Sequence, residues 1–236
     1  MVMPTSSDAR TLADAHPGWP EIAAAAVTYA GLLFLLPPVL TDLAAGDAAL
    51  RGQLLAALSG LLGFAAFGAA FVIRRRRWGA FGVRRVSWRW LLAGLALGVA
   101  AVALSRLVVI VVVALTGDAL VDPQGSYQDA ARAGGASLAL QLVLLGLLTG
   151  AGEEFAFRGV LTNALTRYGS VLAVSVSTVI FAVAHGINLA LVPALIVGLI
   201  AGVLTVRSRS IWPGVVVHVV NNSLGTIVSQ LLTSAA

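Results

Sequence analysis

Seven long apolar segments divide this chain, and they constrain its fold more than any other feature of the sequence. They span about residues 20–40, 54–73, 90–115, 136–157, 171–184, 189–206 and 211–232. A helix needs roughly 20 apolar residues to cross the hydrocarbon core of a bilayer. The segment 171–184 is short by this standard, so we expect it to be a shortened span or to be buried inside a bundle.

The apolar runs are continuous, and this continuity distinguishes the two structures that can span a membrane. In lipid every backbone polar group must be bonded internally, which leaves only helices and closed barrels. Barrel strands alternate apolar and polar residues, which these runs do not do. With 59% hydrophobic and 11% charged residues, the chain is predicted to be all-α, a polytopic transmembrane helix bundle of about seven spans. We expect residues 1–19 to be a polar N-terminal segment and residues 20–236 to be a single membrane-embedded domain.

The charged residues lie mostly at the edges of the apolar segments. The net charge is +5 and all 15 basic residues are arginine, but their position at span edges indicates the lipid bilayer as partner and excludes nucleic acid. By the positive-inside rule, the arginine-rich link 74–89 is cytoplasmic, and so is the N-terminus. The link that contains Asp118, Asp122 and Asp129 is then external. We predict an integral protein of the cell (plasma) membrane.

Two glutamates and an arginine interrupt the fourth apolar segment. An ionisable side chain at bilayer depth costs at least about 2.5–3.5 kcal/mol and tends to persist only where it has a function. Glu154 and Arg158 are four residues apart, in the order that favours an ion pair on a helix. Glu153 lies about 100° around the helix from Glu154 and is left free for proton chemistry. Alternatively, both glutamates end the segment near the cytoplasmic interface, with Arg158 as a flanking charge.

Two later segments each carry a histidine with a partner at helical spacing. His185 follows Phe181 by four residues, and Asn222 follows His218 by four. Taken singly, such residues are more often packing or hydrogen-bonding residues between helices. Their occurrence on consecutive segments, together with the acidic pair, indicates a shared polar interior, because the first two segments carry nothing comparable. Carboxylates and imidazoles in one buried site are the parts needed to activate a water.

Three motifs thus follow one another in the C-terminal half: Glu153-Glu154-x-x-x-Arg158, Phe181-x-x-x-His185 and His218-x-x-x-Asn222. In order and spacing they resemble the motifs of the CAAX protease and bacteriocin-processing family. These are intramembrane glutamic endopeptidases related to the type II CAAX prenyl endopeptidase. The resemblance covers roughly residues 136–232, which we therefore expect to be the catalytic core.

The resemblance implies a role for each motif residue. Glu153 would activate a water that His185 helps to hold, and His218 and Asn222 would stabilise the oxyanion of the tetrahedral intermediate. Glu154 and Arg158, with Phe181, would support the geometry. The chain would be an intramembrane endopeptidase acting on a membrane-associated or prenylated-type peptide or protein, in a cavity entered from the cytoplasm or from lipid.

Two alternatives remain open at this point. Glu153, His185 and His218 would also suit a catalytic zinc with an open water position, although the resemblance favours a mechanism without a cofactor. The chain could instead be a non-catalytic membrane protein, such as a small transporter, an immunity factor or a scaffold. Buried glutamate and histidine also serve proton relays, but no inverted repeat is evident.

Three further features concern the depth of the two histidines, the role of Arg106 and three pairs of glycines. His185 lies 18 residues beyond Arg167, about 27 Å along a helix, whereas His218 lies only 7 residues beyond Ile211, about 10 Å. Straight helices with these boundaries would not bring the two imidazoles to one depth. Arg106, in the middle of the third segment, is expected to form a structural ion pair. Three Gly-xxx-Gly pairs, beginning at residues 94, 146 and 198, are expected to pack within the bundle.

Overall fold

The computed structural model describes residues 16–74, 76–116 and 124–234, and within these ranges the chain forms helices and no strand. Among these described residues, six helices are long and apolar enough to cross a membrane. They are α2 (Trp19–Leu43), α3 (Ala48–Arg74), α4 (Trp88–Thr116), the helical stretch Gly135–Tyr168, α10 (Leu191–Ser208) and α11 (Trp212–Ser234). The predicted transmembrane helix bundle is confirmed, and α9 (Ser170–Ala184) is the short apolar helix that the sequence indicated.

The helical stretch Gly135–Tyr168 is longer than expected and has an irregular middle. It consists of α6 (Gly135–Gln141), the π-helix η3 (Leu142–Thr149), α7 (Gly150–Glu154), the π-helix η4 (Phe155–Thr162), α8 (Asn163–Leu165) and the 3₁₀ turn η5 (Thr166–Tyr168). The expected end near Phe157 was wrong. The acidic pair therefore lies in the middle of a long helix, between two π-helical stretches of the kind that is frequent at functional sites.

Side chains stabilise the wide turns of this long helix. The Thr149 hydroxyl donates to the carbonyl of Leu144 at 3.0 Å, and the Thr162 hydroxyl donates to the carbonyl of Phe157 at 3.0 Å. In both cases the acceptor lies five residues back, which is the spacing of a π-helix. Short polar side chains in the segment thus support the local departure from α-helical geometry on either side of Glu153.

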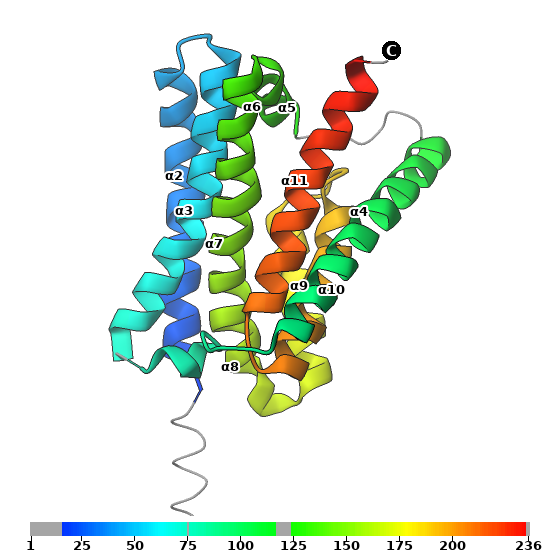
Figure 1. Cartoon of the computed structure of the whole chain (residues 1–236). Helices are drawn as coiled ribbons and strands as arrows, with labels where there is room; N and C mark the ends of the chain where they lie inside the picture. Colours follow the sequence, from blue (N-terminus) through cyan, green and yellow to red (C-terminus); the bar gives the residue numbers. More distant parts are fainter. Residues whose placement is uncertain (1–15, 75, 117–123, 235–236) are drawn as a thin grey trace, which may run out of the picture.

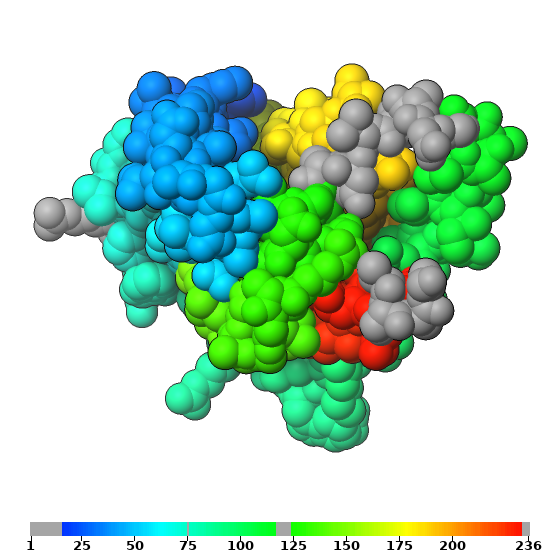
Figure 2. All heavy atoms as spheres, turned by 90° about the horizontal axis from the view of Figure 1, so that it is seen from above, coloured from blue at the N-terminus to red at the C-terminus, as the bar shows by residue number. Residues whose placement is uncertain are grey.

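The long helix separates two groups of helices (Figure 1). The antiparallel pair α2 and α3 lies on one side of it, and α4, α9, α10 and α11 lie on the other. The arginine-rich link between α3 and α4 and the link between α10 and α11 lie at the lower end of the bundle. The short helix α5 (Gly125–Arg132) lies at the upper end with α6, and Figure 2 views the molecule from that end.

The short helix α9 explains how His185 reaches the middle of the bundle. It begins immediately after the long helix and runs back beside it for 15 residues, about 22 Å. Glu153 lies 15 residues before the end of the long helix at Tyr168, so the two side chains reach a similar depth. His218 needs fewer residues because α11 begins inside the bundle, where Ile211 is fully buried and its N–H donates to the carbonyl of Gly82. The mismatch in depth came from assuming that α9 and α11 begin at the same depth.

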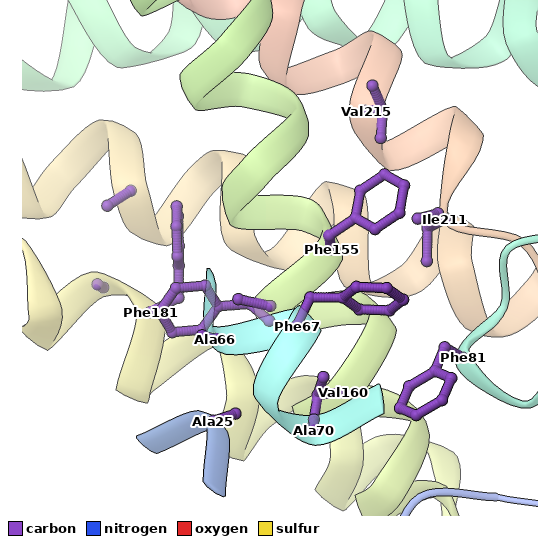
Figure 3. Close-up of a cluster of buried hydrophobic side chains, with 14 residues drawn as sticks. Ala25, Ala66, Phe67, Ala70, Phe81, Phe155, Val160, Phe181, Ile211 and Val215 are labelled. Carbon is purple, nitrogen blue, oxygen red and sulfur yellow. The ribbon is translucent and has the colours of Figure 1, made fainter. Parts of the chain in front are cut away.

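An aromatic cluster fixes the lower half of the bundle (Figure 3). The ring of Phe67 on α3 lies 4.9 Å from that of Phe155 on η4 and 5.1 Å from that of Phe81 in the α3–α4 link. Such tilted and edge-to-face pairs add about 0.5–1.5 kcal/mol each beyond the area that they bury. The cluster joins three separate elements directly beside the acidic pair. By contrast, many large apolar side chains are exposed on the outer faces of the helices, as expected of a surface that contacts lipid.

Glycine pairs and prolines lie at several contacts and turns of the helices. The three Gly-xxx-Gly pairs face neighbouring helices of the same chain, α11 for the first two and α9 for the third, so packing within the bundle is confirmed. Pro213 lies in the first turn of α11, and α2 continues through Pro37 and Pro38 to Leu43. Asp118, Asp122 and most of the N-terminal segment 1–19 lie outside the described residues.

Candidate active site

Glu153 lies at the centre of the bundle and is only 3% exposed. One carboxylate oxygen, Oε1, accepts a hydrogen bond of 3.0 Å from the hydroxyl of Ser59 on α3. The other oxygen, Oε2, has no hydrogen-bond partner among the described residues. It faces two imidazole nitrogens, Nε2 of His218 at 3.4 Å and Nε2 of His185 at 4.0 Å. A buried carboxylate oxygen without a partner is costly, so this atom marks a place where a polar molecule fits.

His185 caps the end of α9 and is held there by its own helix. Its Nδ1 lies 2.9 Å from the carbonyl oxygen of Phe181. Because a carbonyl only accepts hydrogen bonds, this contact assigns a proton to Nδ1. In the neutral ring, Nε2 then carries the lone pair and points toward Glu153. The four-residue spacing of the second motif thus orients the imidazole through the backbone.

The ion pair between Glu154 and Arg158 is confirmed. Oε1 of Glu154 lies 2.9 Å from Nη1 of Arg158, and the two side chains are 0% and 1% exposed. The alternative in which Arg158 flanks the membrane surface is therefore wrong. The same Oε1 lies 3.0 Å from Nδ1 of His218, so Glu154 also orients that imidazole with Nε2 toward Glu153. The two adjacent glutamates have different surroundings, as expected from their positions around the helix.

Phe181 and Gly198 complete the surroundings of this ion pair. Nη2 of Arg158 donates to the carbonyl of Gly198 at 3.1 Å, and the guanidinium lies 4.5 Å from the ring centroid of Phe181. The Phe181 ring also meets the rings of His185 and His218 edge to face, at 4.7 and 5.6 Å. The Phe181 ring therefore contacts the guanidinium of the ion pair and both imidazoles, which agrees with a supporting role.

Asn222 lies one turn beyond His218 on α11 and faces the same cavity. Its Nδ2 donates to the carbonyl of Leu145 on η3 at 3.0 Å, and its Oδ1 accepts a hydrogen bond of 3.3 Å from Asn221. An amide nitrogen has two hydrogens, so one donor of Asn222 remains available after the bond to Leu145. These contacts fix the orientation of the side chain and leave a neutral donor near the two imidazoles.

The four residues predicted to be catalytic, Glu153, His185, His218 and Asn222, line one cavity of about 200 Å³. A second cavity, of about 210 Å³, reaches Glu153 and His185 from the side of α2 and α3. A third, of about 300 Å³, is lined by apolar residues of α2, η4 and α9 and shares Tyr29, Leu33 and Ala184 with the second. Glu153 is therefore accessible from the first cavity and also from the second cavity, which continues into the apolar third cavity.

Sequence reasoning missed several residues of this site. Ser59 was overlooked because a serine in an apolar segment carries no motif, and the second segment has no polar pair at helical spacing like those of the later segments. The helix α5 was also missed, and its Tyr127 lines both cavities that reach Glu153. Burial raises the pKa of Tyr127 to about 12, and the charge of Glu153 adds to this rise, so the phenol stays protonated at neutral pH.

Arg106 does not form the ion pair that we expected. Its Nη2 donates to the carbonyl of Gly225 at 2.8 Å and to the hydroxyl of Ser229 at 2.6 Å, both on α11. Within the described ranges no carboxylate oxygen lies within 4.0 Å of it. The side chain instead lines the catalytic cavity, several residues beyond His218 along α11.

Close backbone packing places the helices around the acidic pair. A Cβ atom on Gly152 would lie 2.1 Å from the carbonyl oxygen of Gly60, and one on Gly63 would lie 2.1 Å from the carbonyl oxygen of Gly152. Only glycine allows α3 to approach the long helix so closely, and this approach brings Ser59 to Glu153. Likewise, a Cβ on Gly214 would lie 2.6 Å from Oε2 of Glu154, so glycine makes room for the carboxylate against α11.

Among the described residues, no group of three or more histidine, cysteine, aspartate or glutamate side chains has the arrangement of a metal site. The polar groups that do converge are one carboxylate oxygen without a partner, two imidazoles and one amide. Such a set can accept a proton from water, hold that water and donate hydrogen bonds to a negative oxygen.

Comparison with known proteins agrees with the motifs. Residues 135–224 match the family model described as type II CAAX prenyl endopeptidase Rce1-like, and they include all three motifs. No curated protein and no solved structure matches the chain. The family match supports a CAAX-type intramembrane protease in general. The match over residues 135–224 thus agrees with the family that the three motifs resemble.

Proposed function

We propose that this protein is an intramembrane glutamic endopeptidase that hydrolyses a peptide bond of a membrane-associated substrate with a water activated by Glu153. The observation that carries the proposal is the position of Glu153 Oε2, which is buried, has no hydrogen-bond partner in the described residues and faces two imidazoles. The cavity around it is polar and large enough for several waters, since each occupies about 30 Å³ in the liquid.

Glu153 is the general base in this proposal. Its Oε2 takes a proton from a water that Nε2 of His185 orients, and the water oxygen attacks the carbonyl carbon of the peptide bond. The proton then passes from Glu153 to the nitrogen of the leaving amine as the carbon–nitrogen bond breaks, which gives a carboxylic acid and an amine. General acid–base catalysis of this kind contributes about 10²–10⁴-fold to the rate.

His218 and Asn222 stabilise the oxyanion of the tetrahedral intermediate. When both ring nitrogens of His218 are protonated, Nδ1 donates to Glu154 and Nε2 donates to the developing negative charge. The free hydrogen of the Asn222 amide supplies a second donor from the same helix. Loss of one such donor in a dry site costs about 3–4 kcal/mol of transition-state stabilisation.

The apolar groove that adjoins the second cavity suits a lipid-modified substrate. It lies between α2, η4 and α9, and it leads through residues shared with the second cavity toward Glu153 and His185. A hydrocarbon chain in this groove would bring an attached peptide close to the carboxylate. We therefore propose that the substrate is a peptide or protein held at the membrane, and that an acyl or prenyl-type chain contributes to its binding.

The test uses the full-length protein reconstituted in lipid vesicles and a mixed-sequence library of lipidated and unlipidated peptides, with products identified by mass spectrometry. We expect the native protein to cleave library members and Glu153→Gln to lose at least 100-fold of this activity while keeping the same unfolding temperature. Asp42→Asn, which removes an exposed carboxylate at the end of α2, is the matched control and should retain full activity. Undiminished cleavage by folded Glu153→Gln would overturn the mechanism.

A further inference from the structure

Arg106 is an unexplained charge in the wall of the catalytic cavity. It is the only charged residue of α4 after Arg89, and it lies near the middle of a helix that otherwise consists of apolar and small residues. An arginine at membrane depth is costly and usually marks a functional site or a pathway. The catalytic set described above does not use it.

Only one nitrogen of the Arg106 guanidinium, Nη2, makes hydrogen bonds to the described residues. Both of its hydrogen bonds, to Gly225 and Ser229, come from Nη2. In the part of the chain that the structure describes, Nε and Nη1 have no hydrogen-bond partner. Nε has one hydrogen and Nη1 has two, so three charged donor hydrogens remain for a ligand. The contacts with α11 thus hold the side chain in place while these donors remain available.

The distance between Arg106 and the proposed catalytic residues can be estimated from the rise of α11, because Arg106 contacts two residues of this helix. Gly225 and Ser229 lie 7 and 11 residues beyond His218, which corresponds to about 10 and about 17 Å of helical rise. An extended peptide covers about 3.3–3.6 Å per residue. A segment of about three to five residues therefore reaches from the bond at Glu153 to the guanidinium of Arg106.

We propose that Arg106 binds a carboxylate of the substrate, three to five residues from the bond that is cleaved. This inference rests on the proposed protease function and adds a specificity-determining residue to it. The carboxylate comes either from the free C-terminus of the substrate or from an aspartate or glutamate side chain at that distance. In both cases the carboxylate accepts a charge-assisted hydrogen bond from Nε or Nη1 of Arg106, and such a bond is roughly twice as strong as one between neutral groups.

The experiment compares cleavage of a peptide library prepared with free C-termini and the same library with amidated C-termini. A third preparation has amidated C-termini and contains acidic residues at varied positions. We expect the native protein to cleave its preferred carboxylate class at least tenfold faster than neutral peptides. Arg106→Gln should lose this preference while it still cleaves neutral peptides, and Arg51→Gln, an arginine outside the cavity, should keep it.

Each outcome of this experiment has one reading. A preference for free C-termini identifies the terminal carboxylate as the ligand, and a preference for acidic side chains identifies the other source. Equal cleavage of all three preparations by the native protein overturns the Arg106 subsite but leaves the protease intact. No cleavage of any preparation contradicts the proposed function itself. Arg106→Lys keeps the positive charge and should retain part of the preference, which guards against misfolding of Arg106→Gln.

The distribution of charge supports a second, independent inference about how substrate enters. The described arginines at the lower end of the bundle are Arg74, Arg76, Arg77, Arg84, Arg85, Arg89, Arg167, Arg207 and Arg209. The upper end, where α5 lies, has Arg51 and Arg132 together with Asp42, Asp47 and Asp129. By the positive-inside rule the lower end faces the cytoplasm.

The catalytic cavity extends toward the opposite end. Beyond Glu153 and His218 its wall includes Gln124 and Gln128 of α5 and Ser229 of α11. Both α5 and the end of α11 lie at the upper end of the bundle (Figures 1 and 2). We infer that the cavity opens to the extracytoplasmic side and that, given the proposed function, the substrate is a peptide presented there and not one that enters from the cytoplasm.

The absence of cysteine from the chain makes this inference directly testable. Ser229→Cys places a single thiol in the cavity wall, and Ser87→Cys places one on the exposed link between α3 and α4. A membrane-impermeant maleimide should label Ser229→Cys in intact cells and Ser87→Cys only after the cells are permeabilised. The reverse pattern, or labelling of Ser229→Cys only after permeabilisation, would overturn the inference. This labelling does not depend on activity, so it separates the direction of entry from the protease function.

Discussion

Ser59 and Glu153 are 94 residues apart in the sequence and are joined by a hydrogen bond of 3.0 Å between two helices of the bundle. The hydroxyl donates to Oε1, so the other carboxylate oxygen points toward the two imidazoles. A serine in an otherwise apolar helix thus determines which oxygen of the proposed base faces the cavity.

The first prediction concerns Ser59. Its replacement by alanine should lower kcat by about 10–100-fold, because a hydrogen bond to a charged group contributes about 1.5–3 kcal/mol to holding the carboxylate. KM should change less, since Ser59 orients the base and is not proposed to bind the peptide. Steady-state kinetics with any peptide cleaved by the native protein would measure both constants.

Ser105→Ala is the matched control for this prediction. Ser105 lines the same cavity, is also a buried serine in a membrane helix, and its hydroxyl has no hydrogen-bond partner among the described residues. Its loss should leave kcat nearly unchanged. An equal decrease for both variants would mean that Ser59 acts only through the packing of the cavity.

The second prediction tests the close approach of α3 to the long helix. A Cβ on Gly63 would lie 2.1 Å from the carbonyl oxygen of Gly152, so Gly63→Ala must push the two helices apart. Such overpacking typically costs about 1–3 kcal/mol. It should also lengthen the contact between Ser59 and Glu153, so that activity falls together with the unfolding temperature.

Gly68→Ala, on the same helix, separates this effect from helix propensity. A Cβ at Gly68 would meet no atom within 4 Å. Alanine is favoured over glycine inside a helix by up to about 1 kcal/mol, so this variant should be as stable as the native protein or slightly more stable. Comparable destabilisation of the two variants, measured by thermal unfolding in detergent, would contradict the packing explanation.

The sequence predicted the fold well because a continuous apolar segment in lipid must form a helix. Continuous apolar runs predicted the helices, and the four-residue spacings predicted which polar side chains share a face. The failures came from tertiary context. Nothing in residues 158–168 signals that the fourth helix continues, because Arg158 resembles a flanking charge until its ion pair with Glu154 is seen.

The same limitation applies to the individual site residues. Ser59 and Tyr127 belong to no motif, and only the packing of α3 and α5 brings them to Glu153. Arg106 was recognised as unusual, but its partners lie on α11, more than a hundred residues later in the chain. Spacing along one helix predicts local neighbours, whereas contacts between helices depend on how closely each pair can approach.

The third prediction concerns metal ions. If the carboxylate, two imidazoles and an amide act on water without a metal, then prolonged treatment with a strong chelator should leave the rate of cleavage unchanged. The measurement is the activity of the purified protein before and after dialysis against the chelator, with the metal content determined in both samples. Loss of activity that zinc restores would instead support the alternative in which Glu153, His185 and His218 bind zinc.

The last prediction concerns the buried pair of Glu154 and Arg158. Arg158→Met removes one partner and leaves the carboxylate of Glu154 buried beside His218, which should destabilise the protein by about 3–5 kcal/mol. The double variant Glu154→Gln with Arg158→Met removes both charges and keeps an oxygen that can accept from Nδ1 of His218. It should therefore recover most of the lost stability, and the two substitutions should be strongly non-additive. Arg85→Met, at an exposed position, should have little effect in the same thermal unfolding assay. Additive losses for Glu154 and Arg158 would show that each side chain stabilises the bundle separately and that their 2.9 Å contact contributes little.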